Sequence, residues 1–269
     1  MVIGFIGCGN LASSLIRGIK GRDQDAIIYV NDINIERSAD IIDEYGLVAT
    51  SFDVVANQSD VLILAVKPNN IKDVLSQLRT QLEGRDKKEL LLITVAAGIG
   101  LWYYESNLPG IPVIRTMPNT SASVCEAITG LVRGKHVTDE QADMAASIFN
   151  CVGSTLFVED DKINALTAVS GSGPAYFYLI AELMCKAGVK LGLTEEEAFL
   201  LANQTLVGAG KMISCGKSPK ELRLSVTSPN GTTHEAIESM LEDDIEGIIY
   251  NAMEKCANRA AEMEAEFTK

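Results

Sequence analysis

The chain has 269 residues, of which 36 are acidic and 23 basic, so its net charge is −13, and 47% of its residues are hydrophobic. This length and composition are typical of a globular protein with one large core or two modest ones. The acidic charge repels nucleic acids and anionic membrane surfaces, so we expect neither as a partner. The six cysteines are scattered without metal-ligand spacing, and no apolar run is long enough to span a bilayer. We therefore expect no metal site and a cytoplasmic protein with reduced cysteines.

Short β-rich runs alternate with amphipathic helical runs in the first part of the chain. Strands are predicted at Val2–Ile6, Ile27–Val30, Val61–Val66, Leu90–Val95, Val113–Arg115, Ile128–Val132 and Thr155–Val158. Helices are predicted around Leu11–Ile19 and at Ile33–Tyr45, Ile71–Leu82 and Asp139–Phe149. This alternation predicts a mostly parallel sheet covered by helices on both faces.

The second part of the chain is predicted to be entirely helical. The helices are expected at Pro174–Leu191, Thr194–Ile213, Pro219–Leu224, Thr232–Leu241 and Ile245–Phe267. We place the domain boundary between residues 162 and 163, which gives domains of residues 1–162 and 163–269. The first two of these helices are apolar on more than one face, so they need burial on several sides. A homodimer in which they interlock would provide it.

A glycine motif, Gly7–Ala12, lies between the first predicted strand and the first predicted helix. Gly7 allows a tight turn, Gly9 lets the backbone approach a pyrophosphate, and Ala12 allows the helix to pack closely on the strand. This strand–turn–helix context predicts a dinucleotide-binding site.

Asn31 and Asp32 follow the second predicted strand. An acidic residue at this place can bond the ribose 2′-hydroxyl of a dinucleotide and so favour NAD over NADP. Asp32 would serve equally well as a solvated N-cap of the following helix. Both interpretations stay open, and with them the choice between NADH and NADPH.

Two further segments close predicted strands. Ala65–Pro68 places Lys67 where it could face a ribose or a phosphate, although a solvated lysine explains it as well. Arg115–Asn119 ends with Asn119, whose side chain offers donors and an acceptor near the expected position of a nicotinamide.

A polar loop opens a predicted helix near the C-terminus. Pro229–Gly231 predicts a turn, because Asn and Gly tolerate left-handed backbone angles, and Thr232 with Glu235 predicts a capping box. Ser228, Thr232 and Thr233 would bring hydroxyls to free backbone N–H groups, a place suited to a carboxylate. Simple capping of the helix explains these hydroxyls as well.

A second hydroxyl-rich helix start, Ser170–Tyr176, is explained adequately by the helix that follows it. Its similarity to the nucleophile elbow of serine hydrolases fails, because Ala175 stands where that motif has glycine and no strand precedes it.

Taken together, these segments resemble those of the pyrroline-5-carboxylate reductases, the enzymes of the last step of proline biosynthesis. The resemblance covers essentially the whole chain and is carried by Gly4–Asn10, Ala65–Pro68, Ala96–Gly98, Arg115–Asn119, Ser170–Tyr176 and Ser228–Thr233. It implies an α/β protein with an N-terminal Rossmann-type dinucleotide-binding domain followed by an all-helical dimerisation domain. It also implies an interlocked homodimer, sometimes assembled into a decamer of five dimers, and NADPH, or less often NADH, as hydride donor.

The resemblance, with the strand-end residues described above, assigns roles to individual residues. The cofactor would contact Gly7, Gly9, Asn10, Leu11, Asn31, Asp32, Ala65, Val66, Lys67, Pro68, Ala97, Gly98, Met117, Pro118 and Asn119. The substrate, 1-pyrroline-5-carboxylate, would contact Ser172, Ser228, Asn230, Gly231, Thr232 and Thr233, in a pocket shared with the partner subunit. Asn230 stands where the family usually has glycine, which we expect to alter the stiffness of the loop more than its function.

Thr233, with Thr232 beside it, is the expected catalytic residue, because it aligns with the threonine proposed in the family to bond the ring nitrogen. The reaction adds hydride to C5 of the cyclic imine and leaves a proton on nitrogen. A threonine hydroxyl is too weak an acid to donate that proton, so Thr233 would orient the substrate while water supplies it.

Two other functions fit parts of the pattern. A β-hydroxyacid dehydrogenase shares the layout, but Ser170–Tyr178 lacks the lysine expected at the start of its second domain. A nucleotide-binding regulator without catalysis is the other alternative, and the intact Thr232–Thr233 pair argues against it.

Overall fold

A computed structural model describes residues 1–34, 36, 39–86 and 89–267 of the chain. The chain forms two compact units, Met1–Gly171 together with Cys256–Lys269, and Ser172–Lys255. The first unit contains the sheet, and the second consists of helices.

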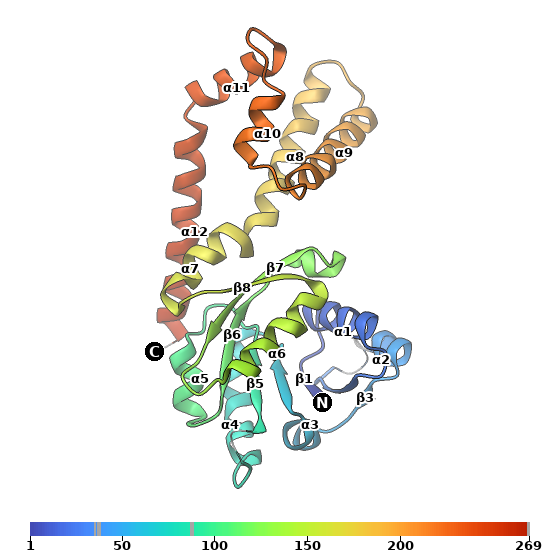
Figure 1. Cartoon of the computed structure of the whole chain (residues 1–269), viewed down its shortest axis with the longest axis vertical. Coiled ribbons are helices and arrows are strands. Elements are labelled where there is room, and N and C mark those ends of the chain that lie inside the picture. Colours follow the sequence, from blue (N-terminus) through green and yellow to red (C-terminus); the bar gives the residue numbers. More distant parts are fainter. Residues whose placement is uncertain (35, 37–38, 87–88, 268–269) are drawn as a thin grey trace. The chain divides into compact units, whose positions relative to one another are not determined.

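An eight-stranded sheet in the order β3-β2-β1-β4-β5-β6-β7-β8 forms the centre of the first unit (Figure 1). The strands are β1 (Val2–Ile6), β2 (Ile27–Asn31), β3 (Val48–Ala49), β4 (Val61–Leu64), β5 (Leu91–Thr94), β6 (Val113–Met117), β7 (Ala127–Arg133) and β8 (Gly153–Phe157). β1 to β6 are parallel, β7 is antiparallel to β6, and β8 is parallel to β7. The order of the first six strands is that of a doubly wound dinucleotide-binding sheet, and the prediction of a mostly parallel sheet is confirmed.

Alternate residues of the central strands enter two separate cores, one on each face of the sheet. In β4, Val61 and Ile63 pack into the core that contains α1 (Asn10–Arg22) and α6 (Asp139–Phe149). Leu62 and Leu64 pack into the opposite core. Both pairs are fully buried, as the two-residue period of a strand covered on both faces requires.

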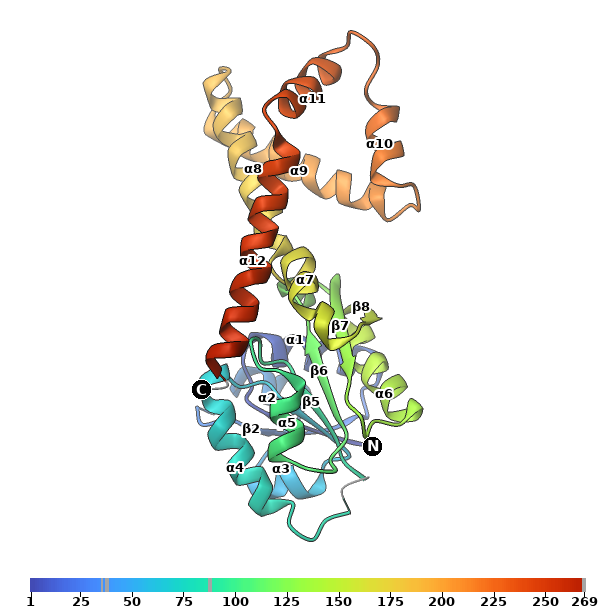
Figure 2. The same ribbon diagram turned by 90° about the vertical axis from the view of Figure 1, so that its left-hand side faces the viewer.

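Helices cover each of these faces (Figure 2). Besides α1 and α6, the first unit contains α2 (Ala39–Tyr45), α3 (Phe52–Gln58), α4 (Ile71–Gln81), α5 (Leu101–Asn107) and α7 (Ile163–Leu166). The sequence pattern missed β3, α3, α5 and α7. These elements have two, seven, seven and four residues, too short for their periodicity to stand out from their surroundings.

The helix predicted at Ile33–Tyr45 was wrong at its N-terminal end, because α2 begins only at Ala39. Ile33 and Asn34 lie before it in a turn, where the Asn34 N–H donates to the Asp32 carboxylate over 2.8 Å. Three residues of the expected helix, at positions 35, 37 and 38, lie outside the described part of the chain.

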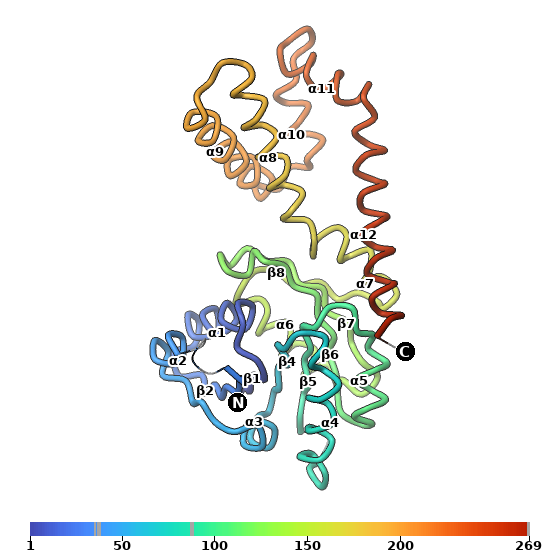
Figure 3. The backbone as a smooth tube through the Cα atoms, turned by 180° about the vertical axis from the view of Figure 1, so that it is seen from behind, coloured from blue at the N-terminus to red at the C-terminus, as the bar shows by residue number. Residues whose placement is uncertain are grey.

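The second unit is helical (Figure 3). It comprises α8 (Gly173–Lys190), α9 (Glu195–Ile213), α10 (Pro219–Ser225), α11 (Thr232–Glu242) and α12 (Ile245–Phe267) as far as Lys255. These bounds agree with the predicted helices to within one residue at each end. α8 and α9 pack against each other, with Gly188 placed so that an added Cβ would lie 3.2 Å from the Cβ of Ala198.

The two compact units divide at Gly171, nine residues after the boundary expected from sequence. α7 and the π-helical turn Thr167–Gly171 belong with the sheet. A Cβ added to Gly130 of β7 would lie 2.3 Å from Leu166, and one added to Gly171 would lie 2.6 Å from Met117. The end of α12 also belongs with the sheet, since buried Arg115 bonds Glu264 over 3.2 Å and Asp160 over 2.9 Å.

Within the described part of the chain, no helix combines the length and the apolar character needed to cross a membrane. The described residues also contain no cluster of three or more His, Cys, Asp or Glu side chains placed to hold a metal ion.

Candidate functional site

The glycine turn after β1 can be formed only by a residue without a side chain. Gly7 has φ +90°, and an added Cβ would lie 2.7 Å from the Ala65 carbonyl oxygen. Its N–H donates to the Asn31 carbonyl over 2.8 Å, so the ends of β1, β2 and β4 meet at this residue. β1 and β4 are the strands between which the order of the sheet reverses, which is where doubly wound proteins bind their ligands.

α1 begins directly behind this turn, with its N-terminal N–H groups uncapped. Gly9 is the N-cap residue and supplies no side chain, and an added Cβ would meet nothing within 4 Å. The first N–H groups of a helix have no partner within the helix and carry a partial positive charge. The open space before Asn10 and Leu11 therefore suits a phosphate group.

Asp32 lies at the same turn. One of its carboxylate oxygens accepts a hydrogen bond from the Cys8 N–H over 2.6 Å, and the other accepts from the Asn34 N–H over 2.8 Å. The neighbouring Asn31 side chain donates to the Thr50 carbonyl over 2.9 Å and so fixes the end of β2. Asp32 does not cap α2, which begins only at Ala39; its carboxylate instead closes a local turn with Asn34 and also bonds the glycine loop at Cys8.

A cavity of about 380 Å³ extends from α1 to the ends of β5 and β6. Six of the expected cofactor residues line it, namely Asn10, Leu11, Ala97, Met117, Pro118 and Asn119. Asn119 has an unusual environment there. Its amide nitrogen donates to the Ser170 carbonyl over 3.2 Å, whereas its buried side-chain oxygen has no hydrogen-bond partner among the described residues. A buried acceptor of this kind is costly unless a ligand donates to it.

These observations test whether the residues present fit a nicotinamide dinucleotide. The open space at Gly9 suits the pyrophosphate, and the orphan oxygen of Asn119 suits a donor such as the N–H₂ of a carboxamide. The residues of the first unit therefore fit the group.

The other expected cofactor residues lie at the same edge of the sheet, outside the lining of this cavity. Ala65, Val66, Lys67 and Pro68 directly follow β4, and Gly98 follows β5. Lys67 is exposed. Gly98 has φ +72° and lies against Met263 of α12.

The loop Ser228–Gly231 forms the turn expected from sequence. Asn230 has φ +58°, a left-handed conformation that asparagine and glycine adopt more readily than other residues, and the Gly231 N–H donates to the Ser228 carbonyl over 3.0 Å. The predicted capping box was wrong, because the N-cap residue of α11 is Gly231 and no side chain caps it. Thr232 is already the first residue of the helix, and the Glu235 N–H that its hydroxyl was expected to bond donates instead to the Gly231 carbonyl over 3.2 Å.

The absence of a capping box leaves the start of α11 available. Within the described part of the chain, the hydroxyls of Thr232 and Thr233 make no hydrogen bond, and both residues are exposed. Uncapped N–H groups and two hydroxyls thus lie together at one helix end, an arrangement that suits a carboxylate. Ser172, the remaining expected substrate residue, precedes α8 and is half-buried.

Three hydroxyl-bearing residues that line the cavity were not identified from sequence. Ser14 lies one turn after Asn10 and donates to its carbonyl over 2.9 Å, and Thr120 and Ser123 lie in the 3₁₀ helix after Asn119. Ser14 could have been found from its helical spacing to Asn10. No local signal identifies Thr120 and Ser123, because their position depends on how the chain turns after β6.

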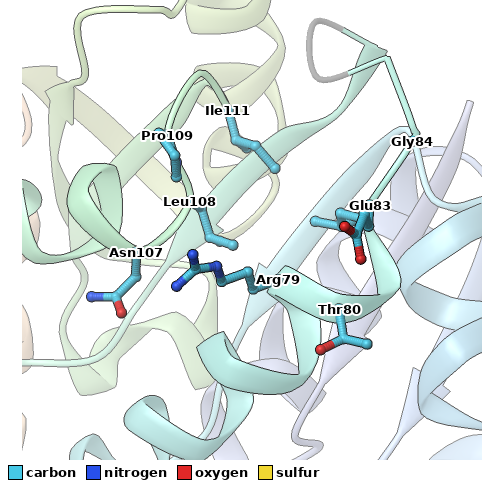
Figure 4. Close-up of a pocket in the computed structure, with 9 residues that line it drawn as sticks. Arg79, Thr80, Glu83, Gly84, Asn107, Leu108, Pro109 and Ile111 are labelled. Atoms are coloured by element: carbon cyan, nitrogen blue, oxygen red, sulfur yellow. The ribbon is translucent and has the colours of Figure 1, made fainter.

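A second cavity, of about 410 Å³, lies between the ends of α4 and α5 and includes Leu108 and Ile111 (Figure 4). The Arg79 side chain extends toward Asn107 there (Figure 4). The residues that line this cavity precede β5 and β6 in the chain, so the cavity lies at the amino edge of the parallel strands. The candidate site lies at the opposite, carboxyl edge, where ligands of such sheets bind.

The two parts of the chain match two sequence families. Residues 160–263 match the family "Pyrroline-5-carboxylate reductase dimerisation". Residues 2–98 match the family "NADP oxidoreductase coenzyme F420-dependent".

Curated relatives and solved structures are similar over nearly the full length. The chain is 40% identical to the pyrroline-5-carboxylate reductase of Pseudomonas aeruginosa, over 97% of this chain and 96% of the relative. It is 39% identical to that of Methanosarcina acetivorans, over 97% of both chains. The structure of a pyrroline-5-carboxylate reductase from Coxiella burnetii has a TM-score of 0.91 and 36% identity, with 97% of both chains covered.

A pyrroline carboxylate reductase of Plasmodium falciparum, solved with NADP bound, has a TM-score of 0.79 and 26% identity over 98% of both chains. The identities above 30% over almost complete chains are decisive, and they agree with the resemblance carried by the sequence motifs. The chain belongs to the pyrroline-5-carboxylate reductase family.

Proposed function

We propose that this chain reduces 1-pyrroline-5-carboxylate to L-proline with NADPH, or alternatively NADH, as hydride donor. The observation that carries the proposal is the cavity beside α1, which is lined both by the first residues of this uncapped helix and by Asn119, whose side-chain oxygen lacks a partner among the described residues. Membership of the family supports the choice of substrate.

The residues of the first unit bind and orient the dinucleotide. The N–H groups of Asn10 and Leu11 would hold its pyrophosphate, and Asn119 would accept a hydrogen bond from its carboxamide. Ala97, Met117 and Pro118 would exclude water around the ring. When bound, the reduced nicotinamide supplies the hydride that adds to C5 of the imine.

The residues of the second unit would bind the substrate. Its carboxylate suits the uncapped N–H groups at the start of α11, with Ser228, Asn230 and Gly231 in the adjoining turn. The Thr233 hydroxyl would bond the ring nitrogen, with Thr232 beside it, while water supplies the proton. Ser172 is the further expected contact, at the start of α8. The contribution of this chain is therefore chiefly the positioning of the reactants.

The dimerisation family that matches residues 160–263 supports an oligomer. We propose a homodimer interlocked through α8 and α9, with five such dimers forming a decamer. Among the described residues, the six cysteines form no disulfide bond. This supports a reducing location, for which we propose the cytoplasm.

The test is the loss of reduced-nicotinamide absorbance with 1-pyrroline-5-carboxylate, measured in parallel with NADPH and NADH, and with the product identified as proline. Rapid oxidation that depends on the imine is expected. No turnover with either donor, in a folded protein that still binds the dinucleotide, would contradict the proposal and indicate a regulator without catalysis.

A further inference from the structure

Asp32 has two bonds that fix its carboxylate at the place where the adenosine ribose of a dinucleotide lies in proteins with this sheet. Its bond with the Cys8 N–H, over 2.6 Å, attaches it to the glycine loop, and its bond with the Asn34 N–H holds it from the other side. The Asn31 side chain anchors the same strand end to Thr50. The carboxylate is therefore held firmly at the rim of the site.

The chemistry of this carboxylate distinguishes the two donors. Each oxygen accepts one backbone N–H and has a further lone pair, so Asp32 can accept a hydrogen bond from a ribose 2′-hydroxyl. It cannot donate to a 2′-phosphate, and its negative charge repels one. Among the described residues Asp32 forms no ion pair with a Lys, Arg or His side chain, so no such partner offsets this charge. Arg37, the basic residue nearest to it in the sequence, lies outside the described part of the chain.

We propose that Asp32 is a specificity-determining residue that makes this chain favour NADH over NADPH. The inference rests on the proposed reductase function and deepens it by naming the donor. NADPH remains a donor, at a disadvantage set by repulsion between the carboxylate and the 2′-phosphate. Like charges within about 5 Å of each other near a protein surface change an affinity by about tenfold or more.

Binding of nucleotide fragments tests Asp32 separately from catalysis. Titration calorimetry would compare adenosine 5′-monophosphate with adenosine 2′,5′-bisphosphate, which differ only in the 2′-phosphate. The wild-type chain is expected to bind the monophosphate more tightly. Asp32→Asn keeps an acceptor for the Cys8 N–H and removes the charge, so it is expected to shift the affinity ratio toward the bisphosphate by about tenfold. Asp73→Asn, which removes the same charge from an exposed position on α4, is the matched control and should leave the ratio unchanged.

The kinetic counterpart is the ratio of kcat/KM for NADH to that for NADPH, which should exceed one in the wild type and fall about tenfold in Asp32→Asn. Asp32→Ser, whose hydroxyl can also accept from the Cys8 N–H, should give the same shift if Asp32→Asn folds poorly. Tighter wild-type binding of the bisphosphate, or a ratio that both variants leave within twofold, would overturn the inference. Absence of imine reduction with an unchanged preference for the monophosphate would instead contradict the proposed function and leave the assignment of Asp32 supported.

Discussion

The two compact units differ in how completely they bury their apolar side chains. In the first unit, side chains such as Phe5, Leu64 and Tyr104 are completely buried. In the second unit the buried hydrophobic residues are three alanines, whereas Leu191 and Leu200 are 87% and 66% exposed. The first unit thus completes its own core, whereas the second presents a large apolar surface that its own helices leave exposed.

This contrast explains why each part has its function. A sheet with two complete cores can hold a dinucleotide in a rigid groove, because its strand ends are fixed from both sides. Helices that are apolar on several faces acquire a stable arrangement through a partner. The start of α11, where we place the substrate, would then depend on the assembly.

The largest expected effect comes from placing a charge in the exposed apolar surface of the second unit. Leu200→Glu places a carboxylate in the proposed dimer interface, where its desolvation costs several kcal/mol, so we expect dimer association to weaken about 100-fold or more and activity to fall with it. Sedimentation velocity with activity measurements on the same samples would show this. Lys217→Glu, in the exposed loop after α9, is the control. A fully active dimer of the Leu200 variant would place the interface elsewhere.

The next prediction tests whether dinucleotide binding belongs to the first unit. Gly9→Ala meets no protein atom within 4 Å, so folding should be unaffected while the methyl group enters the pyrophosphate space. Overpacking of this kind costs about 1–3 kcal/mol, and we expect dinucleotide affinity to fall accordingly.

The matched variant is Gly7→Ala, whose Cβ would lie 2.7 Å from the Ala65 carbonyl at φ +90°. It should lower the thermal midpoint of unfolding, which Gly9→Ala should not. Calorimetric titration and thermal denaturation separate the two. Unchanged affinity in Gly9→Ala would argue against a pyrophosphate at this helix.

Thr233→Ala tests whether the chemistry depends on the second unit. Loss of a hydrogen bond to a charged group costs about 1.5–3 kcal/mol, so kcat should fall by about ten- to a hundredfold while dinucleotide affinity stays constant. Ser239→Ala, farther along α11, is the control. Equal turnover of the Thr233 variant and the wild type would remove Thr233 from the mechanism.

Asn230 gives a smaller effect within the substrate loop. Its φ is +58°, a conformation that costs most residues about 1–2 kcal/mol. This cost is smaller for asparagine and glycine. Asn230→Ala should therefore lower the free energy of unfolding by about 1 kcal/mol, whereas Asn230→Gly should be nearly neutral. Urea denaturation at fixed protein concentration measures both. Equal stability of the Ala and Gly variants would show that the loop does not require this conformation.

The smallest expected effect concerns two capping boxes of the second unit, Thr194–Glu197 and Ser218–Glu221. Hydrogen bonds from Thr194 lower the pKa of Glu197, and those from Ser218 lower that of Glu221. A lowered folded-state pKa means that the contribution is present above the unfolded value, about 4.3, and is lost as the pH falls through the folded value.

Glu197→Gln cannot ionise, so at pH 6 we expect it to be slightly less stable than the wild type. This difference in stability should disappear as the pH is lowered to 3, because the wild-type glutamate is then protonated. Thermal unfolding at both values measures this, and a deficit independent of pH would contradict the assignment. The box of the first unit, Thr138–Gln141, has an uncharged glutamine and should not titrate.

Much of the fold could be predicted because its signals are local. The helices of the second unit were located to within one residue, since proline, capping residues and apolar spacing mark their ends. β3, α3, α5 and α7 were missed because they are short, and the beginning of α2 because Asp32 forms a local turn instead of a helix. The capping box at Thr232 failed because α11 begins one residue earlier than the motif requires, with Gly231 as its N-cap residue.

For the candidate site, the sequence predicted which segments contribute residues better than it predicted how those residues are arranged in space. The glycine turn and the strand-end segments were found from sequence, but the roles assigned to their residues remain predictions. Thr120 and Ser123 lie in the cavity through the course of the chain after β6, which no periodicity reveals.

The sequence by itself determined the alternation of strands and helices, the glycine turn and the family, because each depends on residue types at short, fixed spacings. Only the tertiary structure decided where α7 and the end of α12 belong, since buried Arg115 gathers Asp160 and Glu264 from distant segments. It also decided which helix ends stay uncapped and that the oxygen of Asn119 lacks a partner. Burial and hydrogen-bond satisfaction depend on neighbours far apart along the chain, which a local pattern cannot specify.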